Sequence, residues 1–322
     1  MLLAIFAVLL ALGTALLYML ASSSKDPLDV NIPLAFAQLL LKYLPGYTSS
    51  LKIGSRDQGP DTFSFDTIQV TGRFSISDED IRTFNKAGCG GSPFLLVAKT
   101  TPLVIKLLSD RRCPIKPLGA VNTRNVITFL QTDWHAGTLQ KKDLTYIASF
   151  GTSDGIRRKR GIEFAITIDV LSGGQKFVQM ELWMLQFLPT HHSLREPRLA
   201  GDSDARNIPG VHLSSINMTT QDPRRWAASC KDYNPIHISK LGARLFGFKS
   251  VIAHGNHVAA LALQESGTPM RPFTLELEFV RPMLLPAKFE VLRDDQQQAE
   301  VLTVVSDERR KAHVRVAVKT LD

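Results

Sequence analysis

A carboxylate and an imidazole lie five positions apart in the stretch that runs from Asp232 through Asn234 and Pro235 to His237. Proline breaks a regular helix, so we expect a tight, non-helical path here that turns both groups toward one point. An aspartate paired with a histidine can hold a water molecule, remove its proton and return a proton elsewhere. The spacing therefore indicates general acid–base chemistry, in which the side-chain amide of Asn234 could orient one partner.

A second group of candidates, His254, Gly255 and Asn256, comes directly before an apolar run that begins at Val258. The run predicts a helix with Gly255 at its N-terminus, where backbone N–H groups lack partners within the helix. A glycine there lets a ligand approach the backbone closely, and an unpaired N–H can stabilise negative charge on a carbonyl oxygen. The two groups together predict proton chemistry beside an activated carbonyl.

Each of these residues also has a purely structural explanation. An Asp-x-Asn-Pro string is commonly just a turn, and a single histidine such as His237 is often a hydrogen-bonded core residue. We favour a functional interpretation because all the required groups occur together. Of the eight histidines, only His237 follows an aspartate by five residues, so one active site per chain is expected.

Two similar successions of elements are expected to position these residues. In the second half, an apolar helix at 255–265 precedes strand patterns at 273–281, 287–293, 299–305 and 311–319, with a turn at 293–296. In the first half, the patterns are a strand at 62–71, a helix that opens at Ser77, an apolar helix at 92–108 interrupted by Pro102, and strands at 121–132, 161–171 and 176–187. A Ser-Gly-Gly turn at 172–174 predicts a hairpin between the last two strands. Each half thus reads as a long helix followed by an antiparallel sheet, which predicts an α+β protein with an internal duplication.

Around the candidate residues the sequence resembles the MaoC-like dehydratases, also called R-specific enoyl-CoA hydratases or the hydratase-2 group. The stretches that carry the resemblance are KDYNPIHIS at 231–239, ARLFGF at 243–248, VIAHG at 251–255 and PFTLELEFVRPMLLP at 272–286. The resemblance covers about residues 225–290, and the first half resembles, more faintly, the vestigial N-terminal repeat of two-domain members. It implies a double hot-dog fold, in which two repeats each wrap an antiparallel sheet around a long helix.

The resemblance also implies a hydro-lyase that interconverts a trans-2-enoyl thioester and a (3R)-3-hydroxyacyl thioester. Asp232 and His237 would form the catalytic dyad, and the N–H of Gly255 would hold the thioester oxygen. Asn234, Pro235, His254 and Asn256 would be supporting or substrate-binding residues. Coenzyme A or acyl carrier protein would carry the substrate, and neither a cofactor nor a metal is expected.

Two positions depart from the family pattern. Cys230-Lys231 stands where the family usually has Ser/Thr-Gly before the aspartate, and Asn256-His257 follows Gly255 where the family often has Met. These departures affect the expected substrate preference more than the expected chemistry. Two alternatives stay open: a non-catalytic subunit that binds acyl thioesters or serves in assembly, and a hot-dog thioesterase.

The composition of the 322 residues excludes several other classes of protein. With 44% hydrophobic and 21% charged residues, the chain is neither disordered, nor collagen-like, nor a coiled coil. Three scattered cysteines exclude a disulfide scaffold. The net charge of +8 does not predict nucleic-acid binding, because the basic residues are not interleaved with aromatic ones. The basic run at 157–160 either attracts the phosphates of coenzyme A or a membrane surface, or is a solvated loop.

The first 24 residues contain no charge, and residues 1–21 are almost entirely apolar. About 20 apolar residues suffice to cross a bilayer as a helix, and the basic n-region of a cleaved signal peptide is missing. We therefore expect a single-pass membrane anchor with the catalytic part in the cytosol, although a cleaved signal is the alternative. A second apolar stretch at 33–44 is too short to span, so it either packs on the catalytic part or lies at the membrane surface.

These observations divide the chain into five parts. They are a transmembrane anchor or signal segment (1–24), a juxtamembrane connector (25–59), a degenerate, non-catalytic hot-dog domain (60–187), a linker rich in Pro, Gly, His and charge (188–208), and a catalytic MaoC-like hot-dog domain (209–322). The expected partners are an acyl thioester and the membrane, with a homodimer left open.

Overall fold

The computed structural model describes residues 28, 30–44, 46–47, 52–53, 62–116, 120–187, 208–296, 299–306 and 311–321. The expected anchor at 1–24 lies outside these residues, as do much of the connector and all but the last residue of the linker. Within the described part of the chain, no helix is long and apolar enough to cross a membrane.

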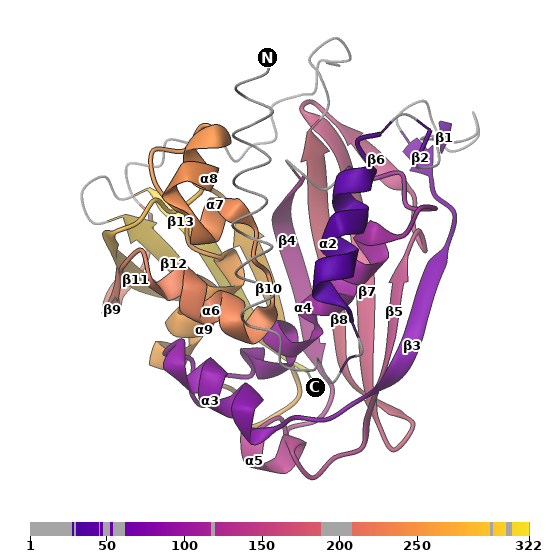
Figure 1. Cartoon of the computed structure of the whole chain (residues 1–322). Helices are drawn as coiled ribbons and strands as arrows, with labels where there is room; N and C mark the ends of the chain where they lie inside the picture. The colour runs from indigo at the N-terminus through magenta and orange to yellow at the C-terminus, as the bar shows by residue number, and fades with distance from the viewer. Residues whose placement is uncertain are drawn as a thin grey trace.

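The first half packs an antiparallel sheet around one long, mostly buried helix, α4 (Phe94–Ser109), which contacts β3 and β5 (Figure 1). Its other elements are α2 (Ile32–Leu41), β1 (Lys52–Ile53), β2 (Thr62–Ser64), β3 (Ile68–Phe74), α3 (Asp78–Lys86), β4 (Ala120–Phe129), α5 (Ala136–Leu139), β5 (Leu144–Phe150), β6 (Gly155–Arg158), β7 (Gly161–Ser172) and β8 (Gln175–Phe187). A capping box opens α3, because the Ser77 hydroxyl accepts the Asp80 N–H and the Asp80 carboxylate accepts the Ser77 N–H.

The second half repeats this plan around α9 (Gly255–Ser266), whose buried side contacts β9, β12 and β13. Its other elements are β9 (Val211–Met218), α6 (Asp222–Cys230), α7 (Pro235–Ile238), α8 (Lys240–Leu245), β10 (Phe273–Phe279), β11 (Ala287–Gln296), β12 (Ala299–Ser306) and β13 (Ala312–Thr320). The predicted helix-and-sheet plan of each half is therefore confirmed.

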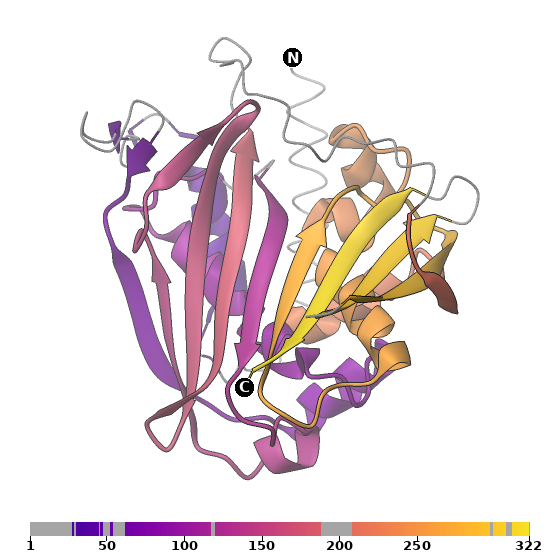
Figure 2. The ribbon, with the colours of Figure 1, turned by 180° about the vertical axis from the view of Figure 1, so that it is seen from behind.

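The two halves share one sheet, which Figure 2 shows from its strand side. All thirteen strands within the described residues belong to it, and its main path runs β1-β2-β6-β7-β8-β4-β10-β13-β12-β11-β9. The halves join where β4 pairs with β10 in antiparallel register. At this seam the rings of Phe129 and Phe273 stack with centroids 4.7 Å apart, and the hydroxyls of Thr128 and Thr274 lie 3.1 Å apart. This pairing joins the strands around α4 and the strands around α9 into one continuous sheet.

Three local predictions were wrong. First, α4 continues through Pro102, because burial of almost every apolar side chain of this helix outweighs one lost backbone hydrogen bond. Second, β11 extends to Gln296, which pairs with Ala299, so the charged residues at 293–296 are strand and not turn. Third, the pattern at 62–71 comprises two strands, since β2 pairs with β6 whereas β3 pairs with β5.

The hairpin between β7 and β8 was predicted correctly. Gly173 and Gly174 both have positive φ, 58° and 79°, and Ser172 pairs with Gln175 across them. Two successive left-handed residues match the right-handed twist of the strands that they join, and glycine adopts this conformation without steric cost.

Candidate active site

The backbone reverses sharply at Lys231, directly before the predicted catalytic aspartate. Lys231 ends α6 in the left-handed region at φ 57°, and its N–H donates to the Ala227 carbonyl at 2.8 Å. Its Nζ turns back and donates to the Ala228 carbonyl at 2.9 Å, which places the ammonium at the negative end of the helix. Glycine favours this left-handed conformation, which accounts for the glycine that the family usually has here.

The stretch after Lys231 forms a chain of local hydrogen bonds. The carboxylate of Asp232 accepts the N–H of Asn234 at 3.2 Å, and the side-chain oxygen of Asn234 accepts the N–H of Ile236 at 3.3 Å. Asn234 thereby caps α7, and Pro235 occupies its first position, where a missing N–H costs nothing. The expected non-helical path is wrong in this detail, because the proline opens a helical turn that carries His237.

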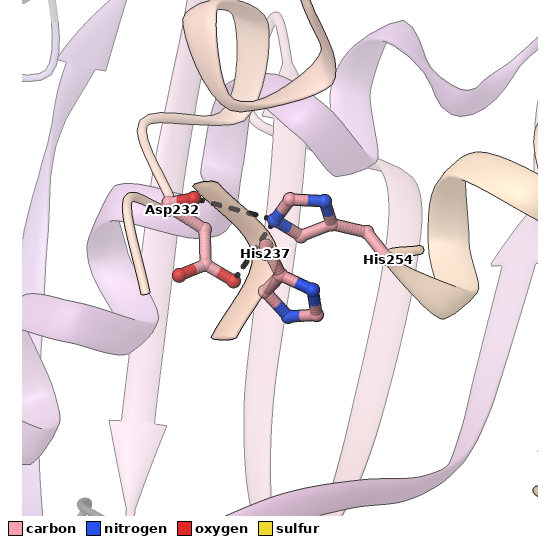
Figure 3. A group of neighbouring side chains, drawn as sticks. All are labelled: Asp232, His237 and His254. Atoms are coloured by element: carbon pink, nitrogen blue, oxygen red, sulfur yellow. Dashed lines mark hydrogen bonds and ion pairs between the residues drawn. The ribbon is translucent and has the colours of Figure 1, made fainter. Parts of the chain in front are cut away.

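Asp232, His237 and His254 meet in one place, and we call them the acid–base cluster (Figure 3). The rings of the two histidines stack with centroids 3.7 Å apart and an interplanar angle of 25°. The Nε2 of His254 lies 3.3 Å from the Asp232 carbonyl oxygen and 3.6 Å from its carboxylate Oδ2. The structure thus gives the supporting residue His254 a direct place beside both expected members of the dyad.

Hydrogen bonds to backbone carbonyls define the proton positions on the two rings. Nδ1 of His237 lies 2.8 Å from the carbonyl oxygen of Ile252, and a carbonyl only accepts, so Nδ1 carries the proton. Nε2 of His237 is then left with its lone pair. By the same argument Nε2 of His254 carries the proton that faces Asp232.

Burial keeps both imidazoles neutral. Desolvation is the main cause that lowers the pKa of His237, and the nearby charge of Asp232 opposes it. Desolvation lowers the pKa of His254 further, and the neighbouring His237 and His257 add to this effect. The Asp232 side chain, by contrast, is 34% exposed. The cluster therefore combines an accessible carboxylate with a neutral imidazole base.

Gly255 is the first residue of α9, as the sequence predicted. A Cβ on this residue would lie 2.3 Å from Cδ1 of Phe279, well inside van der Waals contact. The packing of β10 against the helix therefore requires glycine. The segment before Gly255 is held in place because Ala253 N–H donates to Met283 at 3.0 Å and Leu285 N–H donates to Val251 at 3.0 Å.

The start of α9 is also tied to the first half of the chain. Asn256 accepts a hydrogen bond at 2.9 Å from the side-chain amide of Asn125, a fully buried residue of β4. His257 donates through Nε2 to the Ala87 carbonyl at 2.8 Å and stacks on Trp226 with centroids 5.0 Å apart. Burial lowers the pKa of His257 to about 4. These contacts make the position of the helix N-terminus depend on both halves.

Sequence reasoning missed Asn125, Trp226 and Phe279. Each belongs to an element distant in sequence from the motif it supports, so no spacing signal marks them. The basic run at 157–160 is partly engaged in local contacts: Arg158 pairs with Glu163 at 2.6 Å, and Arg160 lies over the ring of Phe187.

The acid–base cluster also contains the kinds of donor atom that bind metals. One ligand atom from each of its three residues lies within 4.8 Å of the others. The two imidazole rings, however, are stacked with centroids 3.7 Å apart and are inclined by only 25°, so one ion cannot lie close to the planes of both rings, and His254 directs its Nε2 proton to the Asp232 carbonyl. Ligation of one ion by both imidazoles would require the rings to separate. The arrangement suits proton transfer better than metal binding.

Two sequence matches relate this site to known proteins. Residues 208–274 match the family model described as MaoC like domain. The chain is 27% identical over 208 residues to 3-hydroxyacyl-thioester dehydratase X of Mycobacterium tuberculosis, and the alignment covers 61% of this chain and 65% of that relative. The match thus spans slightly less than two thirds of the relative's length. Both matches support a relationship to the MaoC-like dehydratases.

Solved structures agree with the fold. The crystal structure of HtdX from Mycobacterium tuberculosis has a TM-score of 0.63 at 23% identity, and the match covers 80% of this chain and 100% of that one. A MaoC-like dehydratase from Phytophthora capsici has a TM-score of 0.57 at 15% identity, covering 80% of this chain and 96% of that one. These likenesses confirm the predicted hot-dog architecture.

Proposed function

We propose that this protein is a hydro-lyase that adds water to a trans-2-enoyl thioester to give a (3R)-3-hydroxyacyl thioester, and that it also catalyses the reverse dehydration. The observation that carries the proposal is the position of the acid–base cluster directly beside the N-terminus of α9. The name of the mycobacterial relative supports chemistry on 3-hydroxyacyl thioesters in general. The direction of the reaction and the R configuration come from the family resemblance.

In the hydration direction, Nε2 of His237 accepts a proton from water while the water oxygen bonds to C3 of the substrate. The electron pair of the C2–C3 double bond shifts toward the thioester carbonyl, whose oxygen takes up the negative charge. The His237 imidazolium then returns the proton to C2, so that one water has been added and the protein is unchanged. The Asp232 carboxylate orients the water and stabilises the imidazolium.

The negative charge on the thioester oxygen is held by the start of α9. The first N–H groups of a helix have no partner within the helix, and Gly255 is the first residue of α9. The partial positive charge of the helix N-terminus adds to the stabilisation. Because Asn125 and His257 tie this terminus to the first half, that half also positions the catalytic groups. We propose that it shapes the acyl site as well.

The substrate carrier is proposed to be coenzyme A or acyl carrier protein, with no additional cofactor. The test is an activity screen with the purified full chain and trans-2-enoyl-CoA substrates of several acyl lengths, followed by the loss of the conjugated enoyl absorbance. Turnover that gives 3-hydroxyacyl-CoA supports the proposal. Release of free coenzyme A would instead identify a thioesterase, and tight binding without turnover would identify a non-catalytic acyl-thioester subunit.

The substitution Asp232→Asn tests in the same assay whether the charge of Asp232 is needed for turnover. The amide keeps an oxygen that can accept the Asn234 N–H, so the local turn is preserved. Loss of the charge is expected to lower kcat by about 10²- to 10⁴-fold, the usual contribution of a positioned acid–base group. The melting temperature serves as the control for folding. Wild-type turnover by this variant would remove Asp232 from the mechanism.

A further inference from the structure

Helix α2 is apolar on its exposed side as well as on its buried side, where Ile32 and Ala35 pack into the core. Leu34, Ala37 and Leu41 are exposed on its outer face, and Leu34 is 55% exposed. These positions are spaced by three and four residues, so they form one stripe along the helix. An outward helix face normally carries charged or polar side chains. Here the stripe is apolar, and exposed Leu44 lies just beyond the end of the helix.

The charged residue at the end of α2 points the opposite way. Lys42 is fully buried, and its Nζ donates to the carbonyl oxygens of Cys113 at 2.7 Å and Ile115 at 3.4 Å. A buried ammonium is costly unless hydrogen bonds compensate it, so these bonds are needed to keep Lys42 inside. The end of α2 therefore has its cation buried in the protein, whereas Leu34 and Leu41 are exposed. Such an arrangement is typical of a helix face that contacts lipid or protein instead of water.

Aromatic and basic side chains border one end of the apolar stripe. The exposed Tyr43 has the Nζ of Lys116 over its ring at 5.7 Å, and Tyr47 has the guanidinium of Arg111 over its ring at 5.2 Å. Both Lys116 and Arg111 are exposed. Tyrosine and basic residues beside apolar ones are typical of the boundary between lipid headgroups and acyl chains, where the bases attract anionic lipids.

The chain itself leads from this face to its uncharged N-terminal segment. Leu28 is 1% exposed and belongs to the same buried cluster as Ile32 of α2, so the chain is fixed there. Only four residue steps separate Leu28 from Ser24, a distance of at most about 14 Å for an extended chain. If residues 1–24 enter a bilayer, α2 must lie close to its surface.

We propose that the outer face of α2, defined by Leu34, Ala37, Leu41 and Leu44, lies against the surface of an anionic lipid bilayer, with Tyr43, Arg111 and Lys116 at the headgroup level. This face is remote in sequence from the acid–base cluster, and the proposal does not depend on the reaction. It assigns α2 a second role as an interfacial helix that sets the orientation of the catalytic part on the membrane.

The test uses full chains in which one exposed apolar residue is replaced by cysteine and labelled with a polarity-sensitive fluorophore. The test positions are Leu34→Cys and Leu41→Cys. The matched controls are Val211→Cys and Met270→Cys, which are equally apolar and 76% and 78% exposed, but lie in the second half. The three native cysteines are buried and burial raises their thiol pKa values, so only the introduced thiol should react.

The labelled chains are reconstituted into vesicles of phosphatidylcholine with phosphatidylglycerol. Lipids that carry a quencher in the acyl chain should remove most of the fluorescence at Leu34 and Leu41 and little of it at the two control positions. The double substitution Arg111→Gln and Lys116→Gln should reduce this quenching when phosphatidylglycerol is present.

Three results would overturn the proposal. If iodide quenches the labels at positions 34 and 41 as strongly as the labels at the control positions, the outer face of α2 is exposed to solvent. Labels that are protected from iodide without being quenched by lipid would show that protein, either residues 1–24 or a second copy, covers the face. Equal lipid quenching at all four positions would show unspecific adsorption.

Discussion

The substitution Gly255→Ala tests the proposed role of the α9 N-terminus by adding a single methyl group. The new Cβ would lie 2.3 Å from Cδ1 and 2.4 Å from Cε1 of Phe279, whereas ordinary van der Waals contact begins at 3.4 Å. To restore ordinary contact, the start of α9 and the Phe279 ring must separate by about 1 Å. Alanine is otherwise favourable in a helix, so the variant should fold.

This displacement is large on the scale of a catalytic hydrogen bond. An N–H that lies about 2.9 Å from an oxyanion forms a strong hydrogen bond, but at nearly 4 Å it forms none. Loss of one such donor lowers kcat by about 10²- to 10³-fold, which corresponds to about 2.7–4 kcal/mol of transition-state stabilisation. We therefore expect kcat of Gly255→Ala to fall by about this factor, with a smaller change in KM.

The assay is the turnover of trans-2-enoyl-CoA by Gly255→Ala, with and without the second substitution Phe279→Ala. Removal of the ring removes the clash, so the double variant should recover most of the lost kcat. Gly137→Ala is the matched control, because a Cβ at Gly137 meets nothing within 4 Å. A Gly255→Ala enzyme with kcat within twofold of wild type would refute the role of this N–H, and failure of Phe279→Ala to rescue would refute the steric argument.

Three further predictions concern the titrating and ligating groups. Because burial lowers the pKa of His237 and its neutral form is the proposed base, kcat/KM should stay constant as pH falls to 6.5 and decline only below it; a decline centred above pH 6.5 would contradict this assignment. The pKa of His257 falls from 6.5 in the unfolded chain to about 4 in the fold, so below pH 6.5 the unfolded chain binds a proton that the folded chain does not. The free energy of unfolding should therefore be unaffected by His257 above pH 6.5 and should decrease by roughly 3 kcal/mol as pH falls to 4. His257→Phe keeps a ring to stack on Trp226 and should remove this part of the pH dependence in urea unfolding, whereas an unchanged dependence would assign it to other groups. Since one ion cannot lie close to the planes of both stacked rings, His237 and His254, dialysis against a chelator should leave turnover unchanged, and activity restored by added zinc would contradict this.

Much of the fold could be predicted from local patterns. The hairpin at Gly173 and Gly174, the cap at Ser77 and the start of α9 at Gly255 all follow from chemistry within a few residues of each other. The predictions failed where tertiary contacts outweigh local preference. Pro102 does not interrupt α4 because the helix is buried, and the charges at 293–296 stay in β11 because the strand pairs with β12.

The groups that can perform chemistry were recognisable from local signals, namely the spacing from Asp232 to His237 and the glycine at a helix start. How these groups meet depends on contacts between distant parts of the fold. The tertiary structure stacks His254 on His237, joins Asn256 to Asn125 of the other half, and presses Phe279 against Gly255. Spacing and residue type indicate how each segment folds, because hydrogen bonds and caps within a segment are local. Contacts between distant segments, however, depend on the packing of side chains across the shared sheet, which no local pattern encodes.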